Sequence, residues 1–244
     1  MTNTPRVLVV INSPSSGPRR LTGWLEAMGI VLVEHHGADG LPETLAGFHG
    51  VVLLGGGLMP NDYEKAPWLH TERALTREAI DDDVPTLGIC LGAQIIADVA
   101  GGEVRASYGP KERGSTPIHA TELGAADAVI AAIGETSPMI ENHEDMITVL
   151  PEGARLLASS DAVENQAFVI GQHVRGVQFH PEASAESLRL WNEAALTEQG
   201  YDVQAMLDAA DAHHEANTAA SKRLIEAFGR EVLARAEAHA EGAQ

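Results

Sequence analysis

The only cysteine of the chain lies in a heptapeptide, residues 88–94, that has the pattern of a nucleophile elbow. The apolar residues 84–87 before it predict a buried strand, and Gly88 and Gly92 would let the backbone turn sharply around Cys90. The apolar residues after the turn predict a helix, whose positive dipole end would favour the thiolate form of the sulfur. We therefore predict that Cys90 is a nucleophile rather than a buried core thiol.

A thiol nucleophile needs a base beside its sulfur, and one of the eleven histidines has a suitable context. His180 follows the short strand predicted at residues 176–179, so it would stand at the carboxyl end of that strand. Pro181 fixes the backbone after it, and Glu182 could turn back to accept the second imidazole proton. This arrangement predicts a Cys–His–Glu triad.

Most of the other histidines have no flanking motif and lie in predicted turns, at strand ends or on polar helix faces. The sequence contains no HExxH motif and no second cysteine, so no metal site is predicted. A phosphate-binding GxxxxGK[ST] loop is also absent from the sequence, and no cofactor is predicted.

Strands and helices alternate in the part of the chain that must position these groups. Apolar runs predict strands at residues 6–11, 30–33, 50–54 and 84–89, and helical spacing predicts helices at 19–28, 68–80 and 91–100. This alternation predicts a three-layer α/β fold with a mostly parallel sheet and helices on both faces. Ligands of such sheets bind at the carboxyl ends of the strands, where the triple glycine 55–57 and the elbow would meet.

The second half of the chain has a different pattern. Short β-like pieces separated by turns predict a few antiparallel strands, at residues 103–106, 116–120, 146–149, 155–159, 167–170 and 175–179. After Pro181 we expect one helix at 183–198 and one or two more at 204–240. Leu224, Ile225, Phe228 and Val232 give the last segment an apolar stripe, which we expect to pack on the flank of the same domain.

The composition of the chain argues against several classes of protein. The formal net charge of −19 disfavours binding to nucleic acid or to an anionic membrane surface. A single cysteine cannot form an intrachain disulfide, and no apolar stretch is long enough to span a bilayer. The first residues show no leader pattern, so a cytoplasmic location is expected.

The elbow at residues 88–94, together with the segment 176–182, resembles the class I, triad-type glutamine amidotransferase family. Stand-alone relatives of the glutaminase domain of GMP synthetase are the most similar subgroup. The resemblance covers roughly residues 5–190 and implies a flavodoxin-like fold. We therefore expect a catalytic domain at 1–190 and a helical C-terminal extension at 191–244 packed on it.

The resemblance also implies roles for individual residues. Cys90 would be the nucleophile, His180 the general acid and base, and Glu182 the orienting carboxylate. Residues 51–57 match the oxyanion strand of the family, usually written G-G-P, with glycine in place of the proline. The implied oxyanion donors and substrate-binding residues are the backbone N–H groups of Gly56, Gly57 and Leu91, and the side chains of Gln94, Asn142 and His143.

Three functions remain open on the sequence. The first is hydrolysis of the glutamine side-chain amide, with the ammonia passed to a synthetase partner or another acceptor. The second is a stand-alone γ-glutamyl amine or peptide hydrolase with the same triad. The third is a non-catalytic binding or regulatory module. The sequence does not determine the oligomeric state, and a homodimer is compatible with it.

Overall fold

The computed structural model of the chain describes residues 4–242, and strands make up much of them. The strands are β1 (Arg6–Ile11), β2 (Val31–His36), β3 (Gly50–Leu53), β4 (Thr86–Ile89), β5 (Glu103–Arg105), β6 (Glu112–Ala120), β7 (Thr136–His143), β8 (Met146–Val149), β9 (Arg155–Ser159), β10 (Ala167–Ile170) and β11 (Val174–Val177). Nine of them form one sheet in the order β2-β1-β3-β4-β11-β10-β9-β6-β7. The first five in this order are parallel, and each later strand is antiparallel to its predecessor. β5 and β8 form a separate antiparallel pair.

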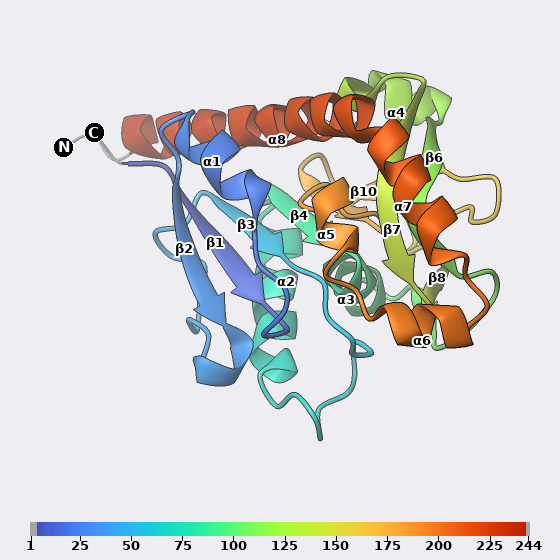
Figure 1. The fold of residues 1–244 in the computed structure, drawn as a ribbon. Helices are drawn as coiled ribbons and strands as arrows, with labels where there is room; N and C mark the ends of the chain where they lie inside the picture. The colour runs from blue at the N-terminus through green and yellow to red at the C-terminus, as the bar shows by residue number, and fades with distance from the viewer. Residues whose placement is uncertain (1–3, 243–244) are drawn as a thin grey trace.

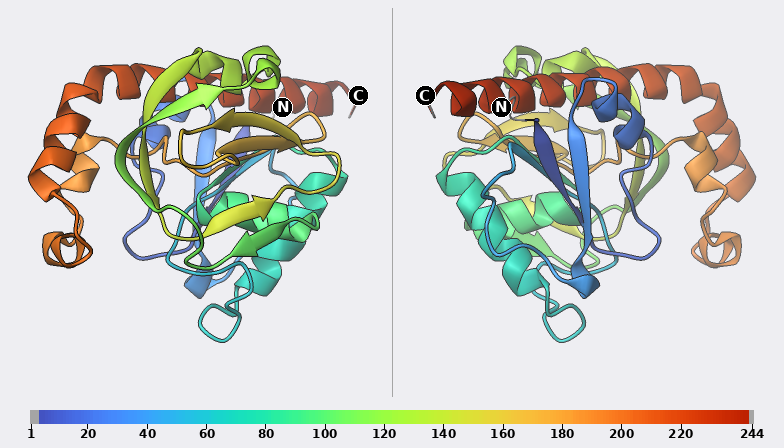
Figure 2. Two further views of the ribbon diagram at one scale, coloured as in Figure 1. Left: turned by 90° about the vertical axis from the view of Figure 1, so that its right-hand side faces the viewer. Right: turned by 90° about the vertical axis from the view of Figure 1, so that its left-hand side faces the viewer.

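Helices cover both faces of the main sheet. They are α1 (Arg20–Glu26), α2 (Leu69–Asp81), α3 (Leu91–Val99), α4 (Glu122–Ala126), α5 (Ala185–Leu188), α6 (Glu193–Glu198), α7 (Val203–Ala212) and α8 (His214–Gly242), with 3₁₀ turns η1 (Gly37–Asp39) and η2 (Ile130–Ile133). α1 and α8 lie on one face, and α2 and α3 lie on the other (Figures 1 and 2). The predicted three-layer α/β fold is therefore confirmed.

Alternation along β1 explains the two halves of the core. Val7 and Val9 point to the face covered by α1 and α8, whereas Leu8 and Val10 point to the face covered by α2 and α3. Such a strand reads as an uninterrupted apolar run because both of its faces are buried.

The long helix α8 crosses one face of the sheet (Figure 1). Its apolar stripe, which includes Leu224, Phe228 and Val232, belongs to the same core cluster as Val7 and Val9 of β1. This stripe therefore packs against the core of the same chain. None of the helices described in residues 4–242 is both long and apolar enough to cross a membrane.

Two local predictions are wrong. The sequence pattern predicts no strand at 136–143, yet β7 occupies these residues as an edge strand of the main sheet. Its buried face carries Ser137, Glu141 and His143 as well as Met139, so its hydrophobic periodicity is weak. The single helix expected at 183–198 is two short helices, α5 and α6, because Asn192 caps a new helix start by accepting a hydrogen bond from the backbone of Ala195.

Candidate active site

Three neighbouring strands of the sheet end at the same edge, and each is followed by one of the predicted site segments. β4 lies between β3 and β11 and is parallel to both. The triple glycine at 55–57 follows β3, Cys90 follows β4, and His180 follows β11. All three segments line one pocket of about 840 Å³. The strand order therefore brings together groups that are far apart in the sequence.

The elbow has the strained geometry that its sequence pattern predicts. Cys90 has φ +54° and ψ −106°, a left-handed conformation that is costly for any residue other than glycine. The turn is also tight, since a Cβ atom on Gly92 would lie 2.2 Å from the carbonyl oxygen of Leu53 in β3. A Cβ atom on Gly88 would lie 2.6 Å from the carbonyl carbon of Gly92. Only glycine fits at these two positions, and the thiol is held where α3 begins.

His180 and Glu182 are joined by a short hydrogen bond. The Nδ1 atom of His180 lies 2.6 Å from Oε1 of Glu182. The backbone N–H of His180 donates to the carbonyl of Ile140 in β7 at 2.8 Å, which fixes the segment after β11. A Cβ atom on Gly55 would lie 3.2 Å from Cε1 of His180 and 3.4 Å from Cβ of Cys90. The imidazole and the thiol therefore flank the same glycine.

The surroundings of His180 favour its protonated form. Burial opposes the imidazolium charge, but the Glu182 carboxylate and the neighbouring Cys90 thiol outweigh it, so the pKa of His180 is raised well above its ordinary value. Nε2 of His180 has no hydrogen-bond partner among residues 4–242. An imidazolium in this position can stabilise a thiolate and can later give its proton to a leaving group.

The residues implied as oxyanion donors lie beside the thiol. Gly56 and Gly57 line the pocket with Cys90. A Cβ atom on Gly56 would lie 3.0 Å from Cβ of Asn12 and 3.3 Å from Cδ2 of Leu91, so β3, β1 and α3 meet closely there. Leu91 begins α3, where backbone N–H groups lack partners within the helix and are free to bind an anion.

The three residues implied as substrate contacts also line the pocket, each with a protein partner. The amide of Gln94, 2% exposed, donates to Oε1 of Gln178 and to the carbonyl of Asp145, both at 3.3 Å. The Oδ1 atom of Asn142 accepts a hydrogen bond from the guanidinium of Arg113. His143 is buried, and its Nε2 atom lies 3.1 Å from Oε2 of Glu112.

The structure adds three residues near the pocket that sequence reasoning missed, Glu112, Glu141 and Gln166, and places them beside the predicted residue His143. Glu112, Glu141 and His143 form a buried group whose candidate ligand atoms lie within 4.8 Å of one another, close enough to share a proton or a cation. Gln166, which is also buried, donates to Glu112 at 2.5 Å. No motif identifies Glu112 or Gln166, and the polar alternation along β7, a strand that sequence analysis did not predict, was the only signal for Glu141.

Asn12, Glu72 and Trp68 form a hydrogen-bonded group next to the glycine segment. Asn12 at the end of β1 donates to the carbonyl of Leu54 at 3.1 Å and to Oε1 of Glu72 at 2.9 Å, and it accepts from the indole of Trp68 at 2.9 Å. Burial raises the pKa of Glu72 to about 7 despite the hydrogen bond from Asn12. This carboxyl therefore changes charge close to neutral pH.

Replacing Glu72 by glutamine is expected to alter the pH dependence of stability. The folded chain holds a proton on Glu72 that the unfolded chain releases above about pH 4.5, so the wild-type protein loses stability as the pH rises from about 4.5 towards 7. Glutamine keeps an acceptor for Asn12 and removes this loss. Above pH 7, the Glu72→Gln variant should gain up to about 3 kcal/mol relative to its difference from wild type below pH 4.5. Urea unfolding across this range measures the effect, and a constant difference would contradict it.

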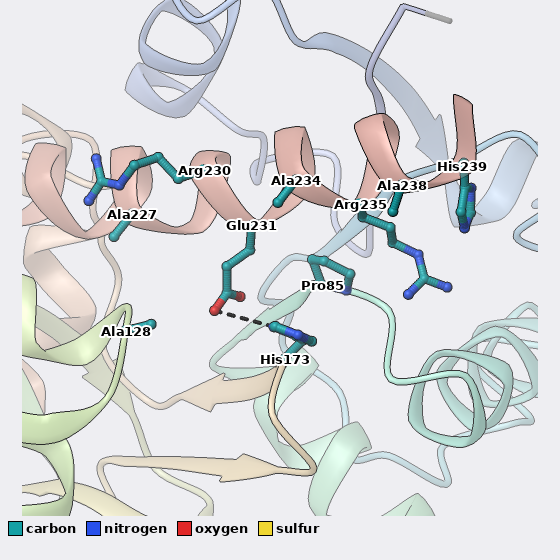
Figure 3. A pocket seen from close by; sticks show the side chains of 10 residues that line it. All are labelled: Pro85, Ala128, His173, Ala227, Arg230, Glu231, Ala234, Arg235, Ala238 and His239. Carbon is teal, nitrogen blue, oxygen red and sulfur yellow. Dashed lines mark ion pairs between the residues drawn. The ribbon is translucent and has the colours of Figure 1, made fainter. Parts of the chain in front are cut away.

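A second pocket of about 510 Å³ lies at the opposite edge of the sheet, between α8 and the residues that precede β4 and β11 (Figure 3). His173 pairs with Glu231 there at 3.3 Å, and Arg235 donates to backbone carbonyls of Asp82 and Asp83. The candidate catalytic groups lie at the carboxyl ends of the strands, away from this pocket.

Comparison with protein families gives a match for residues 28–190 to the model described as glutamine amidotransferase class-I. The glutamine-hydrolysing GMP synthase of Porphyromonas gingivalis is 36% identical over 143 residues, which cover 58% of this chain and 26% of that protein. A glutamine-hydrolysing GMP synthase subunit from Sulfolobus acidocaldarius is 42% identical over 101 residues, covering 41% of this chain and 52% of that protein. The matches thus span about a quarter and about half of these relatives' lengths.

Two further comparisons extend over most of the chain. A putative glutamine amidotransferase-like protein of Salmonella typhimurium, YfeJ, is 29% identical over 188 residues, covering 75% of this chain and 78% of that protein. The crystal structure of a glutamine amidotransferase from Thermotoga maritima superimposes with a TM-score of 0.82 at 26% identity, covering 94% of this chain and 98% of the other.

Proposed function

Since the chain belongs to the class I glutamine amidotransferase family, we propose that it hydrolyses the side-chain amide of glutamine to glutamate and ammonia. In the first step, the thiolate of Cys90 attacks the amide carbon and forms a tetrahedral intermediate. Its oxyanion accepts hydrogen bonds from the backbone N–H groups of Gly56 or Gly57 and of Leu91. Each such donor contributes on the order of 3 kcal/mol to the transition state.

Proton transfer by His180 completes the cycle. The imidazolium gives its proton to the leaving nitrogen, the C–N bond breaks, and ammonia departs from a γ-glutamyl thioester on Cys90. The neutral imidazole then takes a proton from water, whose oxygen attacks the thioester carbon. Cleavage of the C–S bond releases glutamate and restores the starting thiolate–imidazolium pair.

One observation carries this proposal. Cys90, the His180–Glu182 pair and the glycine segment come from three adjacent parallel strands and line the same pocket. The raised pKa of His180 agrees with its role as the proton donor to the leaving group. The side chains of Gln94, Asn142 and His143 would bind the amino-acid end of the substrate.

A synthetase partner is the proposed acceptor of the ammonia. Three of the relatives are named as subunits of a glutamine-hydrolysing GMP synthase, which supports a partner of this kind. The identity of the acceptor would follow from a synthetase that co-purifies with the chain.

The size of the pocket supports a second candidate function, hydrolysis of a larger γ-glutamyl amine or peptide. A volume of about 840 Å³ is in the range of pockets that hold drug-sized ligands, and glutamine is a much smaller molecule. Leu190 and Trp191 line the part contributed by the chain after α5 and offer apolar surface for an attached amine.

Release of glutamate from glutamine and from a panel of γ-glutamyl amines and peptides distinguishes these functions. Turnover of glutamine, accelerated by a co-purifying synthetase, is the result expected for the amidotransferase. If the γ-glutamyl compounds are turned over and glutamine is not, the proposed function becomes that of a γ-glutamyl hydrolase. Absence of turnover with every substrate and partner would leave the non-catalytic binding module.

Replacing Glu182 by glutamine is expected to slow turnover without abolishing it. Glutamine can still accept the Nδ1 proton of His180, but it removes the negative charge that opposes the effect of burial, so the pKa of His180 should fall. We expect kcat/KM to fall on the order of 10²- to 10⁴-fold, less than for loss of the nucleophile. The pH–rate profile should lose activity at its alkaline side first, because the imidazolium deprotonates at lower pH. An unchanged rate and profile would exclude the orienting role.

A further inference from the structure

A buried pair of carboxyl groups lies beside the pocket, outside the triad and without a role in its chemistry. Glu112 of β6 lies directly opposite His143 of β7, and Glu141 precedes His143 by two residues, so the side chains share one face of the sheet. Glu112 is 8% exposed and Glu141 is fully buried. Two carboxylates this close cannot both be charged without a compensating proton or cation.

Glu112 has the partners of an ionised carboxylate. Its Oε1 atom accepts from the hydroxyl of Ser160 at 2.7 Å, and its Oε2 atom accepts from the amide of Gln166 at 2.5 Å. The Nε2 atom of His143 lies 3.1 Å from the same Oε2 atom and can donate to it. Three donors thus converge on this one group, which is what a buried negative charge requires.

The surroundings of Glu141, in contrast, oppose a negative charge. Neither of its oxygens has a hydrogen-bond partner among residues 4–242. Burial, reinforced by the charge of Glu112, raises the pKa of Glu141 well above the ordinary value and outweighs the lowering effects of His180 and Gln166. The Oε1 atom of Gln166 is likewise buried and lacks a donor among the described residues. One proton on Glu141 would supply that donor and would also remove the uncompensated charge.

We propose that Glu141 is held as an uncharged carboxylic acid that donates to Gln166. It would act as a positioning residue for the triad through β7, because the carbonyl of the adjacent Ile140 holds the backbone N–H of His180 at 2.8 Å. The titratable groups that influence it are Glu112 from β6, Cys90 at the elbow and His180 after β11, with His143 beside it on β7. An ionised Glu141 would repel the thiolate of Cys90 and attract the imidazolium of His180, whereas the acid leaves the charges of this pair undisturbed. This role rests on the proposed function of that pair.

A proton explains the cluster better than a metal ion does. The amide N–H of Gln166 donates to the carboxylate of Glu112. A cation between the two carboxylates would lie close to this partially positive N–H group and would be repelled by it. Glu112 is also fully engaged with donors, so only Glu141 and His143 would have free ligand atoms.

The charge state of Glu141 can be measured without any substrate. The folded wild-type chain keeps a proton on Glu141 that the unfolded chain releases, so stability falls as the pH rises above about 4.5, by up to tenfold in the unfolding constant per pH unit. Glu141→Gln removes this loss, so the ratio of wild-type to variant unfolding constants should rise with pH up to the folded pKa. Glu112→Gln keeps Glu141 and removes the charged acceptor of Ser160 and Gln166, so it should destabilise the chain. A ratio for Glu141→Gln that does not change with pH would overturn the proposal.

Alkylation of Cys90, the only cysteine, gives a second readout on the full-length protein. Because glutamine is an uncharged mimic of the acid, Glu141→Gln should react with iodoacetamide at neutral pH within about twofold of the wild-type rate. A several-fold faster reaction would show that wild-type Glu141 is ionised and would overturn the proposal. One equivalent of divalent metal in purified wild-type protein, absent from Glu141→Gln, would also overturn it.

The positioning role is tested by comparing two variants at Glu141. Glu141→Ala leaves Gln166 without a donor and should lower glutamine turnover about tenfold. Glu141→Gln should retain most of the wild-type activity. Equal losses in both variants would overturn the positioning role. If wild-type protein does not hydrolyse glutamine, the proposed function fails, whereas the unfolding and alkylation results still decide the charge state.

Discussion

Replacing Cys90 by alanine is expected to abolish glutamate release, with kcat/KM falling by at least about 10⁴-fold. The thiolate supplies the bond that carries the γ-glutamyl group, and no other cysteine in the chain can replace it. Cys90→Ser should be nearly as inactive, because a hydroxyl does not form the anion that the elbow and His180 favour. The measurement is release of glutamate from glutamine, or from the γ-glutamyl compound that the wild-type protein turns over.

Folding controls separate loss of chemistry from loss of structure. Both variants remove or exchange one small atom at the floor of an open pocket, so their urea midpoints should remain close to the wild-type value. Iodoacetamide should label the wild-type protein once and neither variant at all. Activity retained in Cys90→Ala would show that the elbow is not the reaction centre.

Replacing Gly92 by alanine is expected to have the largest structural effect at the site. The new Cβ atom would lie 2.2 Å from the carbonyl oxygen of Leu53, a backbone atom of a strand held between β1 and β4. The clash cannot be relieved by a side-chain rotation, so α3 or β3 must shift. We expect a loss of about 3 kcal/mol in the free energy of unfolding, and at least a 10²-fold loss of turnover because the elbow moves relative to His180.

Gly23 provides the matched control for this variant. It lies within α1, and a Cβ atom there would meet no atom within 4 Å. Gly23→Ala should therefore raise stability by up to about 1 kcal/mol, since alanine favours the helix. Urea unfolding and glutamate release measured in parallel compare the two variants. Similar stability in both would mean that the close approach of Gly92 to β3 does not constrain the fold.

Sequence patterns succeeded where the chemistry or the burial is local. The tight turn sets the spacing of the glycines around Cys90, and the apolar run of β1 reflects a strand that is buried on both faces. The same reasoning failed for β7, because its buried face mixes apolar residues with Glu141 and His143. His143 is tolerated in the interior through its partner Glu112 on β6, and such a partner cannot be found by spacing along the chain.

The sequence by itself determined the elbow, the pairing of a histidine with a carboxylate two residues later, and the α/β class, since each depends on neighbouring residues or on a short period. Only the tertiary structure decided that β4 lies between β3 and β11, which sets the glycine segment, Cys90 and His180 side by side. It also decided which polar groups are buried without partners, and therefore where charges are favoured or opposed near the thiol. Strand order and desolvation depend on contacts between residues far apart in the chain, and a single sequence does not encode those contacts as a readable pattern.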